Sequence, residues 1–400
     1  MDGGLKVAIV LPTVVKEKEE EIAEASYINL ARATQKAGVD VTFFTLTRNK
    51  QPRVSYLNGV KIVFCPYSIS LSKLPKFLSA AGFTWLTDLK GAHFRYKSAL
   101  SLFNTIRKYR PELIHLRGFF LTNLLMLPLF RACSIPTIIE PVEYPFYRGI
   151  RKSLTKTCLK WATKIFVLEK DVADRLVREC GIPKEKIVRI ECTGFDERLF
   201  FPGDKESSRN KLGLDSGSSY LLYVGSIYPK GFVKDPFELL HVLKELKKTG
   251  EKYKLIVVGP GNVEEYLNFA KELGVHEDVI MAGYMKPSNL NVYYNAADVF
   301  LWPYPQDTLG VGTALTEAMA CGLPVVSYLG KHVPEGESCI KYVPFRDRKA
   351  MAEKVLELLK NDEMRSRLVK NCLQMIREFS FSKVGEKTKL EYEKILGRPP

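Results

Sequence analysis

A glycine-rich segment late in the chain carries the residues best suited to bind an anion. Gly310 and Gly312 precede a helix that we expect to begin at Thr313, and Glu317 lies one turn into it. Unpaired N–H groups and the helix dipole make such a helix start an anion site, and glycines let a phosphate approach the backbone closely. Glu317 could then accept hydrogen bonds from ribose hydroxyls. The alternative is a plain loop–helix–strand unit in which Glu317 is a solvated helix residue.

Net charge and one basic segment favour an anionic partner. The 400 residues include 60 Lys and Arg against 45 Asp and Glu, which gives a formal net charge of +15. Basic residues recur every four positions in one stretch: Arg148, Lys152, Lys156, Lys160 and Lys164. A basic amphipathic helix predicts contact with an anionic membrane surface, whereas a solvated charged face is the alternative. No nucleic-acid-binding motif accompanies the charge, so we expect no nucleic-acid partner.

Composition predicts a globular chain without a resident metal. Hydrophobic residues make up 46% and charged residues 26%, which excludes wholesale disorder. No apolar stretch reaches the roughly 18 to 20 residues of a membrane helix. We therefore expect a cytoplasmic protein, attached peripherally to the inner face of the membrane if the basic helix binds lipid. The eight cysteines form no CxxC pair and no zinc spacing, so we expect reduced structural thiols and no metal site.

The elements that must position these residues follow an α/β pattern. Short β-rich runs alternate with longer amphipathic segments, which predicts parallel sheets covered by helices. Expected strands before a turn-rich stretch near 201–218 are 6–11, 39–45, 60–65, 112–116, 137–140, 164–168 and 187–191. Those after it are 220–224, 254–258, 279–282, 298–302, 324–327 and 340–343. Expected helices include 19–37, 236–248, 263–273, 313–320, 348–360 and 381–396. Two tandem Rossmann-like domains explain this order, with ligands in a cleft beyond the strand ends.

Several stretches resemble one enzyme family. TEAMACGLPVV, residues 316–326, is similar to the signature of the GT-B nucleotide-sugar glycosyltransferases of the large retaining family 4. Similar stretches in the expected order are PELIHLRG (111–118), KIFVLEKDVADRLV (164–177), IECTGFDERLFFPGD (190–204), LLYVGS (221–226), LIVVGPG (255–261) and AGYMKPSNLNVYYNAADVFLWP (282–303). The resemblance covers almost the whole chain. It implies a GT-B arrangement of an acceptor-binding domain (1–197), a donor-binding domain (198–378) and a final helix (379–400) that crosses back onto the first domain.

The resemblance also implies a donor site in the second domain. Lys234, and as a second candidate Lys230, would neutralise the diphosphate leaving group, unless both are ordinary surface lysines. The backbone near Gly283–Met285 would hold the base. The implied donor contacts besides these lysines are Gly225, Ser226, Gly283, Tyr284, Met285, Gly310, Gly312, Thr313, Ala314 and Glu317.

Three positions depart from the family pattern. The second glutamate of the family falls at Leu309, and Asp307 is the candidate replacement unless it merely caps a turn. The arginine that follows the first strand of the second domain is replaced by Ser226. The histidine of the first domain aligns with Val142, beside Glu143. We take Lys234, Asp307 and Glu143 as the candidate catalytic residues.

Polar residues at two strand ends are candidates for the acceptor side. Glu140 ends one expected strand, His115 ends the preceding one, and Arg117 lies two residues after His115. They could bind acceptor hydroxyls. Alternatively, the glutamate is an ordinary strand-end charge and His115 is a hydrogen-bonded structural residue.

The implied function is transfer of a sugar from a nucleotide-diphosphate sugar to a glycan or lipid-linked acceptor, with retention of configuration. The nucleotide sugar would be a co-substrate rather than a cofactor. Because three family residues are replaced, a catalytically silent glycosyltransferase-like binding subunit is the main alternative. Another GT-B enzyme, such as a sugar-nucleotide epimerase, is a second one.

Overall fold

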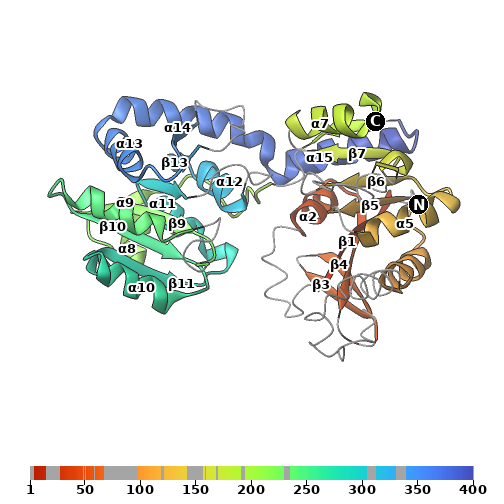
Figure 1. The fold of residues 1–400 in the computed structure, drawn as a ribbon, viewed down its shortest axis with the longest axis horizontal. Helices are drawn as coiled ribbons and strands as arrows, with labels where there is room; N and C mark the ends of the chain where they lie inside the picture. The colour runs from red at the N-terminus through yellow and green to blue at the C-terminus, as the bar shows by residue number, and fades with distance from the viewer. Residues whose placement is uncertain are drawn as a thin grey trace, which may run out of the picture. The chain divides into compact units, whose positions relative to one another are not determined.

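The computed structural model (Figure 1) consists of two compact units. It describes residues 4–14, 28–47, 49, 51–57, 59–66, 97–118, 121–141, 156–157, 159–167, 170–190, 194–228, 235–303, 312–329 and 339–399. The first unit comprises Met1–Gly194 together with Phe381–Pro400, and the second comprises Phe195–Ser380. The domain limits that we expected, 197 and 378, lie within three residues of these divisions.

The first unit is built on an eight-stranded sheet with the order β3-β4-β2-β1-β5-β6-β7-β8. The strands are β1 Lys6–Val14, β2 Asp40–Thr47, β3 Arg53–Leu57, β4 Val60–Pro66, β5 Leu113–Arg117, β6 Thr137–Glu140, β7 Lys164–Val167 and β8 Ile187–Arg189. All neighbours pair in parallel except β3 and β4. Strand β3 was not expected, because its apolar residues Val54 and Tyr56 are exposed on an edge strand and form no continuous apolar run.

Two helices from opposite ends of the chain pack together in this unit. Helix α2 (Asn29–Lys36) and helix α15 (Phe381–Ile395) share a buried apolar cluster with β1, β2 and β4. A Cβ atom on Gly385 of α15 would lie 2.1 Å from the carbonyl oxygen of Ala33, so glycine permits the close helix crossing. Figure 1 shows α15, in dark blue, among the elements of the first unit. Further described helices of this unit are α5 Leu121–Ala132, α7 Lys170–Cys180 and residues 97–108.

The second unit is built on a six-stranded, fully parallel sheet with the order β11-β10-β9-β12-β13-β14. Its strands are β9 Ser219–Val224, β10 Tyr253–Val258, β11 Val279–Gly283, β12 Val299–Trp302, β13 Val325–Tyr328 and β14 Ile340–Val343. Its helices are α8 Lys205–Leu212, α9 Glu238–Lys247, α10 Val263–Glu272, α11 Asn291–Ala296, α12 Thr313–Ala320, α13 Arg348–Lys360 and α14 Asp362–Ile376. The prediction of two α/β domains with parallel sheets is confirmed.

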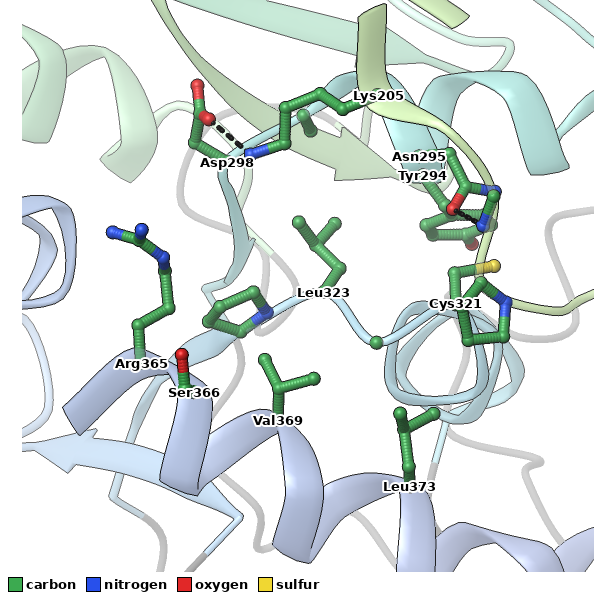
Figure 2. Close-up of a pocket in the computed structure, with 15 residues that line it drawn as sticks. Lys205, Tyr294, Asn295, Asp298, Cys321, Leu323, Arg365, Ser366, Val369 and Leu373 are labelled. Carbon is green, nitrogen blue, oxygen red and sulfur yellow. Dashed lines mark hydrogen bonds and ion pairs between the residues drawn. The ribbon is translucent and has the colours of Figure 1, made fainter. Parts of the chain in front are cut away.

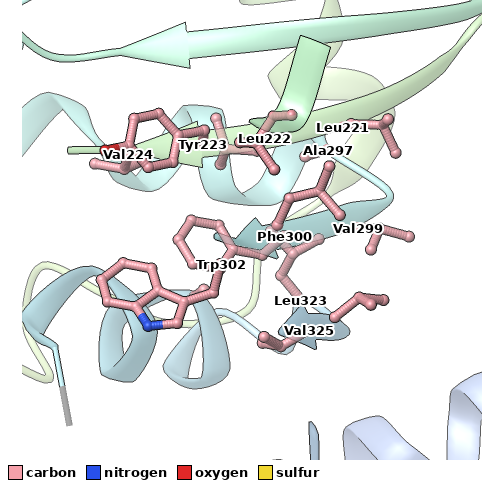
Figure 3. Close-up of a cluster of buried hydrophobic side chains, with 14 of the residues drawn as sticks. Leu221, Leu222, Tyr223, Val224, Ala297, Val299, Phe300, Trp302, Leu323 and Val325 are labelled. Carbon is pink, nitrogen blue, oxygen red and sulfur yellow. The ribbon is translucent and has the colours of Figure 1, made fainter. Parts of the chain in front are cut away.

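The central strands of this second sheet are apolar along their length because helices cover both faces. Figure 3 shows side chains of β9, β12 and β13 packed into one cluster, with Phe300 and Trp302 among them. Helix α9 packs beside α13, and α11 packs beside α8. This rigid core holds the strand ends from which the candidate site is built.

Candidate functional site

The residues that we expected to bind a donor follow strands of the second sheet. Gly225 and Ser226 come directly after β9, Gly283 ends β11, and Gly312 stands between β12 and α12. All six strands are parallel, so their carboxyl ends meet at one edge of the sheet. The structure therefore brings these residues to the edge where open α/β sheets bind ligands.

The start of α12 is shaped by a close contact with an aromatic ring. Gly312 is the N-cap residue, has extended backbone angles and provides no side-chain cap. A Cβ atom at this position would lie 2.5 Å from the indole ring of Trp302, so only glycine fits. The first N–H groups of a helix, here those of Thr313 and Ala314, have no acceptor within the helix. They remain suited to binding an anion.

Glu317 lies in this helix and pairs with a tyrosine that the sequence did not single out. Its side chain is buried, and its Oε2 atom accepts a hydrogen bond of 2.8 Å from the hydroxyl of Tyr294 in α11. Burial raises the pKa of Glu317 from 4.5 to about 8, although the tyrosine hydrogen bond opposes the rise. The carboxyl group is consequently protonated at neutral pH and can both donate and accept hydrogen bonds. Glu317 is not the solvated helix residue of the alternative interpretation.

An exposed aromatic residue stands near the glycine that ends β11. Tyr284 is 48% exposed, and Met285 packs against the core beside it. An exposed aromatic face at this sheet edge can stack on a heterocyclic base. The carbonyl group of Ser226 accepts a hydrogen bond of 3.0 Å from the Tyr223 hydroxyl, which holds the loop after β9.

Several of the expected site residues lie outside the described part of the chain. They are Val142, Glu143, Lys230, Lys234, Asp307, Leu309 and Gly310. Their predicted roles at the diphosphate, the donor sugar and the acceptor therefore stay predictions.

The expected acceptor-side residues form a buried network in the first unit. Arg117 binds Glu140 through two hydrogen bonds of 2.8 and 2.9 Å. The Nε2 atom of His115 faces a carboxylate oxygen of Glu140 at 3.3 Å, although the angle is poor for a hydrogen bond. We therefore assign the proton to Nε2, so that Nδ1 accepts a hydrogen bond of 2.7 Å from the Tyr392 hydroxyl of α15.

Burial and charge determine the protonation states in this network. Burial lowers the pKa of His115 more than the Glu140 carboxylate raises it, so the imidazole is neutral. Burial by itself would raise the pKa of Glu140, but the charge of Arg117, its two hydrogen bonds and the nearby His115 ring outweigh it. The carboxylate is therefore ionised and fully engaged. These contacts support a structural role that joins α15 to the sheet, and acceptor binding by the three residues stays a prediction.

The expected basic helix ends before Lys164. Residues 156–157 and 159–161 are helical, whereas residues 142–155 and 158 lie outside the described part. Lys164 belongs to β7, and its Nζ atom donates a hydrogen bond of 2.5 Å to the carbonyl oxygen of Glu185. Its placement on the membrane-facing stripe was therefore wrong, because the helix ends before it. Lys160 and Trp161 are exposed, and Lys156 is half-buried.

A pocket of about 280 Å³ lies elsewhere in the second unit (Figure 2). Asp298 and Pro324, which line it, precede β12 and β13, so the pocket is at the edge opposite to the candidate donor residues. Val369 and Leu373 of α14 form part of its wall, and an ion pair of 2.8 Å joins Lys205 to Asp298 at its border. Tyr294 also lines this pocket, and its hydroxyl donates the hydrogen bond to Glu317.

Within the described residues, no group of three or more His, Cys, Asp or Glu side chains could hold a metal ion. Among the same residues, no helix combines the length and apolar character that crossing a bilayer requires.

Comparison with protein families assigns both halves of the chain. The profile of "Glycosyl transferases group 1" matches residues 204–375, and that of "Glycosyltransferase Family 4" matches residues 23–193. The chain belongs to the GT-B glycosyltransferases of group 1. Alpha-monoglucosyldiacylglycerol synthase from Streptococcus pneumoniae is 26% identical to this chain over 257 residues. That alignment covers 60% of the chain and only 56% of the relative, so the match spans about half of the relative's length.

Solved structures share the fold over nearly the full length. Sucrose-phosphate synthase from Thermosynechococcus elongatus superposes with a TM-score of 0.72 at 18% identity, covering 98% of this glycosyltransferase and 99% of that chain. Anabaena HepE, solved in complex with UDP, gives a TM-score of 0.72 at 13% identity and covers 98% and 100% of the two chains. At these identities the likeness establishes the fold, and the predicted GT-B fold is confirmed.

Proposed function

We propose that the chain transfers a sugar from a nucleotide-diphosphate sugar to an acceptor with retention of configuration. The observation that carries the proposal is the start of α12: an uncapped helix at Gly312, held against Trp302, with the buried Glu317 one turn further on. This arrangement lies at the carboxyl edge of a parallel sheet, inside the segment that matches the group 1 family. HepE, which shares the fold, has been solved in complex with UDP.

Each described residue then has a chemical role toward the donor. The N–H groups of Thr313 and Ala314 stabilise negative charge on the departing diphosphate, together with the predicted contacts from Lys234 and Lys230. Tyr284 and the neighbouring backbone hold the base, and the protonated Glu317 exchanges hydrogen bonds with ribose hydroxyls. The leaving phosphate takes the proton of the acceptor hydroxyl, so no protein base is required.

A nucleotide screen tests the donor site. UDP, GDP and ADP at millimolar concentration should raise the melting temperature of the full chain far more than free glucose does. Glu317→Gln should weaken nucleotide binding by roughly two- to tenfold, because a hydrogen bond to the neutral, protonated carboxyl group is worth about 0.5–1.5 kcal/mol. Glu272→Gln, at an exposed position of α10, is the matched control. The absence of a shift with all three nucleotides would defeat the assignment.

Product analysis separates an enzyme from a silent binding subunit. Purified protein is incubated with nucleotide sugars and a panel of glycan and lipid acceptors, and the anomeric configuration of the product is read by NMR. Turnover should survive EDTA, since the proposal assigns charge neutralisation to protein groups and treats the nucleotide sugar as co-substrate. Nucleotide binding without turnover, with activity appearing only in Leu309→Glu, would favour the silent subunit.

We further propose a lipid-linked or glycan acceptor and peripheral attachment to an anionic membrane. The relative from Streptococcus pneumoniae is named for the synthesis of a glycolipid. Trp161, 38% exposed beside the exposed Lys160, has the amphipathic chemistry of a membrane-interface anchor. Lys156→Glu with Lys160→Glu should reduce binding to phosphatidylglycerol vesicles, whereas Lys271→Glu with Lys370→Glu, an equal charge change, should not. Equal binding by the two double variants would refute this attachment.

A further inference from the structure

Two exposed apolar residues follow β13 and β14, the last two strands in the order of the second sheet. Leu329 follows β13 and is 41% exposed, and Phe345 closely follows β14 and is 48% exposed. Neither residue belongs to the candidate donor site. Large apolar side chains left open at this edge of a parallel sheet lie where such sheets bind ligands.

Arg346, the next residue, has an unusual backbone conformation. Its φ of +61° lies in the left-handed region, which costs free energy for any residue with a Cβ atom and none for glycine. A residue held in such a conformation is a candidate for function. Its guanidinium carbon lies 5.3 Å from the ring centre of Phe345, so the two side chains present one continuous surface.

The charged neighbours of Arg346 leave its donors available. Its guanidinium nitrogens lie 3.7 Å from a carboxylate oxygen of Glu238 and 3.9 Å from one of Asp235. Both distances exceed that of a hydrogen bond. Glu238 is instead bound by Arg348 through two hydrogen bonds of 2.8 and 2.9 Å. Arg346 therefore keeps N–H groups that can bind a ligand.

A buried hydroxyl beneath this surface lacks a partner. The ring of Tyr328 meets that of Phe345 edge-on, with 5.6 Å between the centroids. Its hydroxyl is buried and has no hydrogen-bond partner among the residues that the structure describes. Charges of Glu238 and Arg348 act on it. A buried hydroxyl without a partner is costly, so the core beneath Phe345 is an incompletely satisfied region.

We propose that Phe345, Arg346 and Leu329 form a carbohydrate-binding subsite. The C–H face of a sugar ring packs on an aromatic ring and on aliphatic side chains, and its hydroxyls pair with a planar guanidinium group. The charges around this surface favour a neutral polyol over an anion. Three acidic residues (Asp235, Glu238 and Asp347) outnumber the two arginines, Arg346 and Arg348. They also disfavour a purely apolar ligand. That this sugar belongs to an acceptor or product glycan rests on the proposed glycosyltransferase function.

Saturation-transfer NMR on the full chain tests the subsite, with methyl α-glucoside, maltose, maltotriose and N-acetylglucosamine as probes. The wild type should show transfer to sugar C–H protons, and Phe345→Ala should weaken the affinity by about tenfold. Arg346→Gly should weaken it too while keeping or raising the melting temperature, since glycine relieves the backbone strain. Phe201→Ala, which removes an equally exposed phenylalanine of the same unit, should change nothing.

The outcomes separate this inference from the proposed function. Sugar signals that are absent in the wild type, or unchanged in Phe345→Ala and Arg346→Gly, would overturn the subsite. UDP-induced stabilisation is measured on the same samples. UDP binding without sugar binding at these residues would refute the subsite alone, whereas sugar binding lost in Phe345→Ala without any nucleotide binding would support the subsite and refute the donor assignment.

Discussion

Replacing Glu317 with glutamine tests the protonation state of the candidate donor carboxyl. Burial raises its pKa from 4.5 to about 8, so the folded chain holds this proton more tightly than the unfolded chain does. Such a group costs nothing below pH 4.5, and its cost grows as the pH rises towards the folded-state pKa. The wild type should therefore lose stability between about pH 4.5 and pH 8. Glutamine cannot ionise, so Glu317→Gln should lack this part of the pH dependence.

The size of the effect follows from the two pKa values. Between pH 5 and pH 9, a carboxyl whose pKa rises from 4.5 to about 8 on folding destabilises the protein by about 4 kcal/mol. For a unit of this size, that corresponds to roughly 8 to 16 °C in melting temperature. At pH 5 the variant and the wild type should melt almost together, and at pH 9 the variant should melt higher by this amount.

Differential scanning calorimetry of the full chain from pH 5 to pH 9 provides the measurement. The informative quantity is the difference between variant and wild type, because other titrating groups cancel in it. Glu272→Gln is the control and should follow the wild type at every pH. Tyr294→Phe removes the hydrogen bond that opposes the rise in the pKa, so it should steepen the wild-type trend. A Glu317→Gln difference that stays constant with pH would show that the carboxyl is ionised and would refute this account of its burial.

Three further substitutions each test a packing or hydrogen-bond contact within one of the two units. Tyr392→Phe removes the hydroxyl that donates a hydrogen bond to Nδ1 of His115 and leaves this buried nitrogen without a partner. The first unit should lose about 1–3 kcal/mol of stability, measured by thermal melting. Gly385→Val places side-chain atoms against the backbone of α2, so α15 should detach and become sensitive to limited proteolysis, and unchanged protease resistance would contradict the close crossing. Gly312→Ala drives a Cβ atom into the Trp302 ring, which should cost about 1–3 kcal/mol. The affinity for nucleotides should fall together with the stability. If Gly312→Ala were as stable as the wild type and bound nucleotides as tightly, the start of α12 would have space for a Cβ atom.

The fold was predictable because its signals are local. Each apolar run of the second unit that we expected to be a strand is one, and the helices 313–320 and 348–360 begin and end where expected. Periodicity and turn residues act within a few positions, so one sequence suffices to read them. The same local reasoning missed β3, since an exposed edge strand buries only part of its side chains and leaves no apolar run.

The sequence predicted where the candidate site lies in the fold better than it predicted which side chains contact one another there. Gly312, Glu317 and Gly283 could be assigned to strand ends and a helix start because the chain order alone puts them there. The four-residue spacing that included Lys164 failed, because spacing gives no position at which a helix must stop. The segments 229–234 and 304–311, which hold Lys234 and Asp307, lie outside the described residues.

The sequence by itself determined the order of all strands but β3, the parallel arrangement of the two sheets apart from that strand, and the edge at which a ligand would bind. Only the tertiary structure decided which polar side chains meet. Glu317 is hydrogen-bonded to Tyr294, 23 residues away in the sequence, and His115 to Tyr392, 277 residues away. Such surroundings set the protonation states, because burial and a single neighbour can move a pKa by several units. Local sequence carries no information on that neighbour, since it comes from a helix that folding brings in from elsewhere in the chain.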